Sequence, residues 1–228
     1  MNDRGETAAF FDAIAERYDR DYARTRDELR ESVARALALI PRTGRILDLG
    51  VGTGCELPML LDAGHEVVGL DISKAMLALC ERRSRPVRVI LGDLWQRLPF
   101  DDASFDAVLA LFGTLSHAPS AEARAELPFE VARVLRPGGV FVAEVPTSAW
   151  LDHGGAEGFT GVQRLGSGEG RFVDRRSTKS VALSLLSADE WQKLFSAALT
   201  VRVEGDAGGE IVIFGSKDGR HSGQGRVA

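Results

Sequence analysis

The stretch RILDLGVGTGCEL, residues 45–57, joins an apolar run to three glycines placed at every second position. The apolar run is typical of a buried strand, and the residues that follow the glycines are typical of a helix. Glycine weakens regular structure, but it lets another group approach the backbone without a Cβ in the way. We therefore expect a ligand close to Gly50 and Gly52, and close packing of the following helix at Gly54. A tight strand–helix turn without a ligand is the alternative.

Apolar runs alternate with helical patterns along the rest of the chain. Four more runs rich in β-branched residues lie at residues 65–71, 87–93, 105–112 and 138–146. Such strands, separated by helices, indicate a parallel sheet with helices on both faces. Two last runs, at residues 200–205 and 209–215, are joined by a connection too short for a parallel crossover. The sequence thus predicts an α/β fold with a seven-stranded, mostly parallel sheet and an antiparallel last strand.

The two ends of the chain differ from this alternating pattern. Residues 8–22 and 26–40 carry apolar positions at helical spacing, so we expect residues 1–40 to form an N-terminal helical cap. The polar, glycine-rich residues 217–228 are typical of a disordered tail. The sequence shows no internal repeat and no linker, so residues 1–216 are predicted to form a single domain.

Residues 147–185 interrupt the alternation and are rich in Gly, Ser and Arg. We expect strand-like pieces in GRFVD and KSVALSLL, and we expect this insert to shape a substrate pocket. A solvated β-excursion is the alternative. Just before the insert, residues 120–135 are predicted to be helical with an interruption at Pro128, because proline removes a hydrogen bond inside a helix.

Two carboxylates follow predicted strands at the edge where the glycine loop lies, since the carboxyl ends of parallel strands meet at one edge. Asp71 can accept both hydroxyls of a ribose there, and a partner for the next helix is the alternative. Asp93 can accept from an exocyclic amine of a base, and a turn residue is the alternative. The GxGxG spacing differs from the dinucleotide pattern GxGxxG, which needs glycine where Cys55 stands.

The composition excludes several classes of protein. A net charge of −5 and a pI near 5.5 argue against a nucleic-acid partner. The two cysteines, Cys55 and Cys80, have neither CxxC nor metal-ligand spacing, so we expect reduced thiols and no metal. No apolar leader pattern and no run of about 20 apolar residues is present. We therefore expect a cytoplasmic protein without a membrane partner, while its oligomeric state stays open.

Four motifs occur in a fixed order: ILDLGVGTG, VVGLDIS, LGDLWQRLPFDDASFDAVLALF and VARVLRPGGVFVAEVP. Together they resemble the motifs of the class I S-adenosylmethionine-dependent methyltransferases. The start, FFDAIAERYD, is similar to the N-terminal helix of the ubiquinone/menaquinone-type members. The resemblance covers residues 8–146 and implies a Rossmann-like fold, with S-adenosyl-L-methionine as cofactor and S-adenosyl-L-homocysteine as product.

The resemblance also implies roles for individual residues. Asp48 and the glycine loop match the motif that holds the methionine part of the cofactor. Asp71 matches the acidic residue that binds the ribose diol, and Ile72 the apolar residue that packs on adenine. Tyr18 lies where similar enzymes close an N-terminal helix over the cofactor. The complete set of implied cofactor-binding residues is Tyr18, Asp48, Gly50, Gly52, Gly54, Asp71, Ile72, Asp93, Leu94, Leu111 and Phe112.

A sulfonium already carries a good leaving group, so the protein mainly has to align the acceptor with the methyl group and exclude water. A general base is needed only when the acceptor atom must lose a proton. His117, behind the fourth predicted strand, is the best-placed base. A structural histidine bonded to a backbone carbonyl is the alternative. His153, in the insert, is a second position that can be a base or a surface residue.

The expected function is therefore methyl transfer from S-adenosyl-L-methionine to an O, N or C atom of a small-molecule acceptor. A non-catalytic module that binds S-adenosylmethionine or S-adenosylhomocysteine is the alternative, and an NAD-dependent oxidoreductase is a more remote one. The sequence does not indicate the acceptor or the atom that is methylated.

Overall fold

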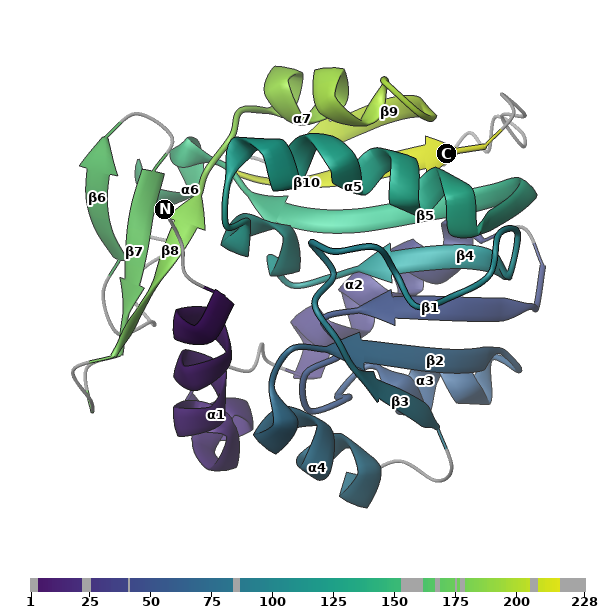
Figure 1. Ribbon diagram of the computed structural model, residues 1–228. Coiled ribbons are helices and arrows are strands. Elements are labelled where there is room, and N and C mark those ends of the chain that lie inside the picture. The colour runs from purple at the N-terminus through teal and green to yellow at the C-terminus, as the bar shows by residue number, and fades with distance from the viewer. Residues whose placement is uncertain are drawn as a thin grey trace.

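A seven-stranded sheet forms the centre of the molecule, in the strand order β3-β2-β1-β4-β5-β10-β9 (Figure 1). The computed structural model describes residues 4–21, 26–40, 42–83, 87–152, 162–166, 169–174, 176, 179–205 and 209–217. The strands of the sheet are β1 Arg45–Leu49, β2 Glu66–Asp71, β3 Arg88–Leu91, β4 Phe105–Ala110, β5 Leu135–Pro146, β9 Thr200–Gly205 and β10 Glu210–Ser216. The predicted number of strands is confirmed.

The pairing of the strands also agrees with the predicted mostly parallel sheet and its antiparallel last strand. Strands β1 to β5 pair in parallel with their neighbours, whereas β10 pairs antiparallel with both β5 and β9. The chain moves outward from β1 to β2 and β3, and then returns to place β4 on the other side of β1. This reversal makes the carboxyl ends of β1 and β4 a topological switch point, where open α/β sheets bind their ligands, and we refer to this position as the crevice.

Helices cover both faces of the sheet. Helices α2 Arg26–Leu39, α3 Leu57–Asp62 and α4 Lys74–Arg83 bury apolar side chains against one face, together with Ile46 of β1. Helices α5 Ala121–Val134 and α7 Ala188–Phe195 pack on the other face, together with Leu47. Because side chains alternate along a strand, successive residues of β1 belong to opposite layers of the core.

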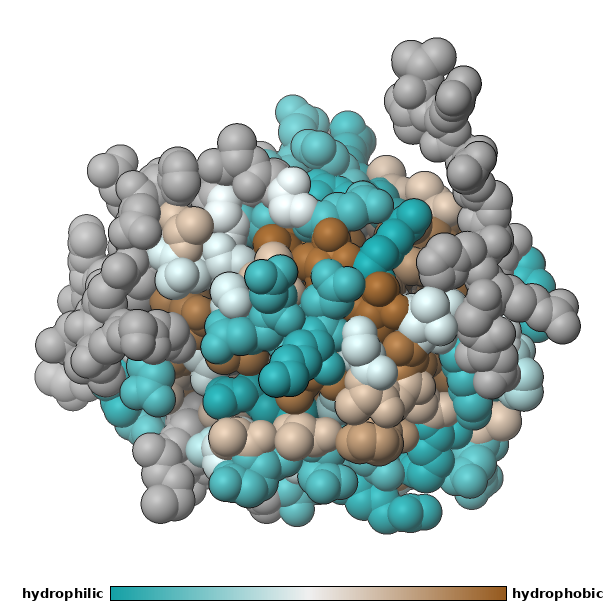
Figure 2. Space-filling model, turned by 90° about the horizontal axis from the view of Figure 1, so that it is seen from above, coloured by the Kyte–Doolittle hydropathy of each residue, from teal (hydrophilic) through white to brown (hydrophobic). Residues whose placement is uncertain are grey.

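Helix α7 illustrates why these helices form, because it has one buried and one exposed face and a capped start. Trp191 and Phe195 are buried, while Asp189, Gln192 and Lys193 are exposed. Ser187 caps the helix in a capping box with Glu190. Figure 2 looks down on this side of the molecule, where hydrophilic side chains alternate with smaller hydrophobic areas.

One prediction about a helix is wrong. Helix α5 runs without interruption from Ala121 to Val134, and Pro128 lies inside it with its ring buried. The buried ring adds apolar contact at a position where the helix packs on the sheet, which offsets the lost hydrogen bond. The Ser120 hydroxyl accepts from the Ala123 amide at 3.2 Å and caps the helix.

The insert forms a second, three-stranded antiparallel sheet of β6 Val162–Gly166, β7 Glu169–Val173 and β8 Ser180–Ser184. The strand-like pieces GRFVD and KSVALSLL are thus strands, and the short helix α6 Ser148–Asp152 precedes them. In Figure 1 this small sheet lies beside helix α1 Arg4–Asp21, on the side where the central strands end. His153 and the tail from residue 218 onward lie outside the described residues.

Candidate functional site

The loops that carry the predicted cofactor residues gather at one edge of the central sheet. Residues 50–54 follow β1, Asp71 ends β2, Asp93 follows β3 and Leu111 follows β4. These four strands are adjacent in the order β3-β2-β1-β4. The structure therefore brings together residues that are up to 61 positions apart in the sequence, on both sides of the strand reversal.

The three glycines of the loop all have positive φ angles, but they face different surroundings. A Cβ on Gly52 would meet no atom closer than the Gly50 carbonyl oxygen at 3.9 Å, so this position faces open space. A Cβ on Gly50 would lie 2.5 Å from the Thr114 side chain, and one on Gly54 would lie 2.7 Å from both Cys80 and Leu57. Gly54 thus permits close packing as expected, whereas only Gly52 leaves the backbone accessible to a ligand.

Asp71 is held by two backbone amides, one in the glycine loop and one in the turn after β2. Its Oδ2 accepts from the Gly52 amide at 2.8 Å, and its Oδ1 accepts from the Ser73 amide at 2.8 Å. Burial raises the pKa of Asp71 to about 6, while these backbone donors act in the opposite direction. Each carboxylate oxygen keeps a second lone pair, so the group can still accept a ligand hydroxyl.

Asp93 and Leu94 lie in the turn after β3. The Asp93 Oδ1 accepts from the Trp95 amide at 2.9 Å, which fixes the turn. Asp93 is half-buried, Leu94 is buried, and Ile72 at the neighbouring strand end is half-buried. The turn role and a role toward a ligand are compatible, because the aspartate carries two oxygens.

The turn after β4 contains a strained residue. Phe112 has φ of 56°, a left-handed conformation that is uncommon for a bulky side chain. It stands between buried Leu111 and Gly113, and the Gly113 amide donates to the Glu144 carbonyl oxygen at 3.0 Å. Strained residues cluster at functional sites, where surrounding contacts hold them in place. This outlier lies at the same sheet edge as the glycine loop.

Asp48 lies inside β1 and below the crevice, together with a residue that the sequence analysis did not single out, Glu56. Only 2% of Asp48 and 3% of Glu56 is exposed. Within the described part of the chain, Oδ2 of Asp48 and Oε1 of Glu56 are buried without a hydrogen-bond partner. Burial and the neighbouring carboxyl group raise the pKa of Asp48 well above its usual range, and burial raises that of Glu56. Two such groups are best satisfied by sharing a proton.

This carboxyl pair predicts an unusual dependence of stability on pH. Between the ordinary pKa values of 3.8 and 4.5 and the raised native values, the folded protein binds more protons than the unfolded chain, so stability falls as pH rises. A Glu56→Gln variant keeps a donor for Asp48 and removes one of the two titrating carboxyl groups, together with its repulsion of the other. We expect its Tm near neutral pH to exceed that of the wild type by about 3–5 °C per unit of pKa shift removed. Thermal unfolding at several pH values measures this.

The matched control for that experiment is Glu81→Gln, which removes the same charge from an exposed position on α4. We expect the advantage of Glu56→Gln to disappear below about pH 3, under the ordinary pKa values of 3.8 and 4.5, where the wild-type pair is protonated in both the folded and the unfolded state. An equal Tm for both variants at every pH would contradict the shared proton.

His117 and Tyr18 lie among aromatic rings between α1, the turn Thr114–His117 and the small sheet. The His117 Nδ1 lies 3.2 Å from the Ala182 carbonyl oxygen, and the ring packs edge-on against Phe11 at 5.3 Å between centroids. Phe11 also contacts Tyr18 edge-on at 6.4 Å. Burial lowers the pKa of His117 to about 4, so the imidazole is neutral at pH 7.

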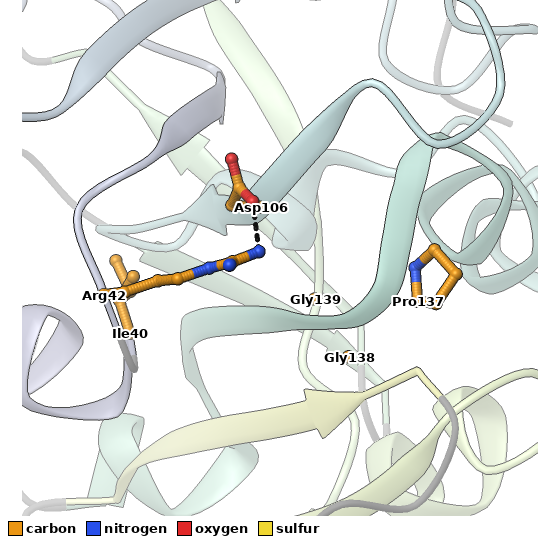
Figure 3. Close-up of a pocket in the computed structure, with 6 residues that line it drawn as sticks. All are labelled: Ile40, Arg42, Asp106, Pro137, Gly138 and Gly139. Atoms are coloured by element: carbon orange, nitrogen blue, oxygen red, sulfur yellow. Dashed lines mark hydrogen bonds and ion pairs between the residues drawn. The ribbon is translucent and has the colours of Figure 1, made fainter.

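A shallow depression lies at the opposite edge of the sheet (Figure 3). Arg42 points across it toward Asp106, and the residues that line it are Ile40, Arg42, Asp106, Pro137, Gly138 and Gly139. Asp106 also accepts from Arg136 at 2.5 Å, so its charge is compensated by arginines. The depression lies at the amino ends of β4 and β5, away from the candidate site.

The described residues contain no group of three or more His, Cys, Asp or Glu side chains placed to hold a metal ion. None of their helices combines the length and apolar character needed to cross a bilayer.

Comparison with known proteins addresses the family directly. A family model described as a methyltransferase domain matches residues 46–139, which span β1 to the start of β5. A demethylmenaquinone methyltransferase from Beutenbergia cavernae is 38% identical over 165 residues, covering 69% of this chain and 65% of that protein. These matches support a class I S-adenosylmethionine-dependent methyltransferase. The resemblance read from the four motifs is thereby confirmed.

Solved structures show the same methyltransferase fold. The PH0226 protein from Pyrococcus horikoshii OT3 has a TM-score of 0.72 at 22% identity, covering 88% of this chain and 98% of that one. A structure described as the DhpI–SAH complex also reaches 0.72, at 20% identity, covering 95% and 98%. At these identities the similarity speaks for the fold. The chain spans slightly less than two thirds of the first curated relative, so reaction and acceptor are considered separately below.

Proposed function

We propose that this chain transfers the methyl group of S-adenosyl-L-methionine to an O, N or C atom of a small-molecule acceptor. The observation that carries the proposal is the open backbone at Gly52 beside the carboxylate of Asp71, whose two oxygens each accept only one backbone amide among the contacts described above. The family match and the relative's name support the same reaction. When bound, S-adenosyl-L-methionine supplies a methyl group on a sulfonium, which needs no further activation.

The residues at the carboxyl edge fit this cofactor. The space at Gly52, which a Cβ would fill, suits the close approach of the methionine part. We assign the ribose hydroxyls to Asp71, the adenine to Ile72, Asp93 and Leu94, and the flank of the methyl group to Leu111 and Phe112. Asp48 is too deeply buried for direct contact, so we assign it to support of the glycine loop from below.

We propose that residues 1–40 and 147–185 shape the acceptor pocket. Phe10 and Ile14 of α1 are buried in one apolar cluster with Val181 of the small sheet, and Tyr18 packs against this cluster. Helix α1 and the small sheet, which carry this cluster, lie on the side where the central strands end (Figure 1). Such surroundings exclude water and suit an apolar or aromatic acceptor. The relative's name makes a demethylmenaquinone-type quinol the first acceptor to test.

Thermal unfolding with added cofactor tests the first half of the proposal. We expect S-adenosylmethionine and S-adenosylhomocysteine to raise the Tm by about 5–10 °C at 100 times their Kd. NADH serves as the control nucleotide, and we expect no shift with it. A Tm unchanged by both sulfur compounds would overturn the proposal.

Mass spectrometry tests the second half. The protein is incubated with isotope-labelled S-adenosylmethionine and either a demethylated quinol or a fractionated metabolite extract. We expect a product that carries one labelled methyl group. Cofactor binding without any labelled product would instead favour the non-catalytic binding module.

We retain His117 as the proposed general base for acceptors that must lose a proton. Its neutral imidazole can accept a proton, but a pKa of about 4 makes it a weak base. A general base whose pKa lies near the working pH typically accelerates the reaction by at least about 100-fold. Because the pKa of His117 is about 4, well below neutral pH, we expect His117→Gln to lower kcat by only about 10-fold. Cofactor affinity should stay unchanged. An unchanged kcat with a lowered Tm would assign His117 to packing against Ala182 alone.

A further inference from the structure

We propose that helix α1 closes a ring of hydrogen bonds around the carboxylate of Asp71, to which we assigned the ribose hydroxyls. In this ring Asp12 and Asp19 act as positioning residues for the cofactor. The inference rests on the proposed function, because it concerns the same site. Both aspartates lie in the N-terminal stretch FFDAIAERYD, but the sequence analysis assigned neither of them a role. Both lie on one face of α1, seven residues apart, and each binds a hydroxyl at a different side of the crevice.

The first side of the ring runs from α1 to Asp71 through the turn after β2. The Ser73 hydroxyl donates to Oδ1 of Asp12 at 2.6 Å, and the Ala75 amide donates to the same oxygen at 3.0 Å. Asp12 therefore caps the start of α4 from another helix, where a negative charge is favourable. The Ser73 amide in turn donates to Oδ1 of Asp71. The position of α1 is thus connected to Oδ1 of Asp71.

The second side runs from Asp71 back to α1 through the glycine loop. The Gly52 amide donates to Oδ2 of Asp71, and the next residue, Thr53, donates its hydroxyl to Oδ1 of Asp19 at 2.6 Å. Arg83, at the last turn of α4, also binds both Thr53 and Asp19. Thr53 is only 2% exposed, so this hydroxyl has little access to water as a replacement partner.

Helix α1 can join the two sides because it is itself firmly packed. Phe10 and Ile14 are at most 1% exposed and lie in one cluster with Met76 of α4 and Val181 of β8. Figure 1 shows α1 between α4 and the small sheet. Movement of α1 would therefore remove acceptors from Ser73 and Thr53 together, and both donors to Asp71 would lose their fixed spacing.

Calorimetric binding of S-adenosylhomocysteine to the full chain tests this ring. We expect Thr53→Val, which keeps the shape and removes the hydroxyl, to weaken binding about 10-fold, the value of a hydrogen bond to a charged group. Asp12→Ala should weaken it similarly at the other joint. Because either change opens the same ring, we expect the double variant to bind within about 3-fold of the weaker single variant, rather than about 100-fold more weakly than the wild type.

Two controls separate positioning from general damage to the fold. Thr53→Ser restores the hydroxyl, and we expect binding within about 2-fold of the wild type, a difference well below one hydrogen bond. Glu16→Gln removes the exposed contact of α1 with Arg82 of α4, at 3.4 Å, without touching the ring, and should bind like the wild type. Wild-type affinity of folded Thr53→Val, or additive losses in the double variant, would overturn the ring. Failure of the wild type itself to bind would overturn the proposed function instead.

Discussion

Replacing Gly52 by alanine is expected to weaken S-adenosylmethionine binding by about 5- to 150-fold, the range of about 1–3 kcal/mol for an atom forced into occupied space. In the ligand-free protein the added Cβ meets nothing closer than 3.9 Å. The substitution therefore costs only the left-handed backbone, at φ of 52°, which is about 1–2 kcal/mol for a residue with a Cβ. The loss appears when the cofactor occupies the same space.

Gly54→Ala is the matched comparison for this prediction. Its φ of 70° carries a similar backbone cost, but its Cβ would lie 2.7 Å from Cys80 and from Leu57. We expect Gly54→Ala to lower the Tm more than Gly52→Ala, and Gly52→Ala to lower affinity more at equal Tm. Titration calorimetry and thermal unfolding of both variants measure this. Wild-type affinity in Gly52→Ala would mean that the cofactor does not approach the backbone there.

Asp71→Asn is expected to weaken S-adenosylmethionine binding by about 10- to 150-fold, the range for a hydrogen bond to a charged group. Both oxygens of Asp71 accept backbone amides, from Gly52 and Ser73. An asparagine offers one oxygen and one NH₂ group, so one of these amides would face a donor and the loop would lose its spacing. Asp62→Asn, at an exposed position on α3, is the control and should bind like the wild type.

The raised pKa of Asp71 gives this prediction a pH signature. Because the ionised group accepts the ribose hydroxyls, binding requires the deprotonated form. In the free protein the pKa of Asp71 is about 6. Wild-type affinity should therefore fall as pH drops below 6, by up to about tenfold per pH unit. The affinity of Asp71→Asn should be flat over the same range. A wild-type affinity that does not change with pH would remove the Asp71 carboxylate from the binding site.

The edge of the sheet where the site lies could be predicted from the sequence, because it depends on strand order alone. Gly50, Asp71, Asp93 and Leu111 each follow an apolar run, and the ends of parallel strands meet. The different roles of the glycines could not be predicted. The same residue type faces open space at position 52 and Cys80 at position 54, and Cys80 comes from a helix 26 residues further along the chain.

The surroundings of the carboxylates also depend on long-range packing. Asp48 shares a face of β1 with Ile46, and this face is covered by the helices α2 to α4, so the side chain is buried beside Glu56 rather than exposed at the crevice. Asp12 and Asp19 received no role in the sequence analysis, because their contacts with α4 and the glycine loop arise only when α1 packs against them. The interruption predicted at Pro128 failed because local propensity did not include the burial of the ring.

Strand β10 has a consequence for the order in which the protein can assemble. It is the last described strand along the chain, yet it lies between β5 and β9 and pairs with both. During synthesis, β5 leaves the ribosome long before β10 and waits with an unpaired edge that can bind another nascent chain. Emergence of β10 therefore covers this edge of β5 and ends its exposure to pairing with other chains.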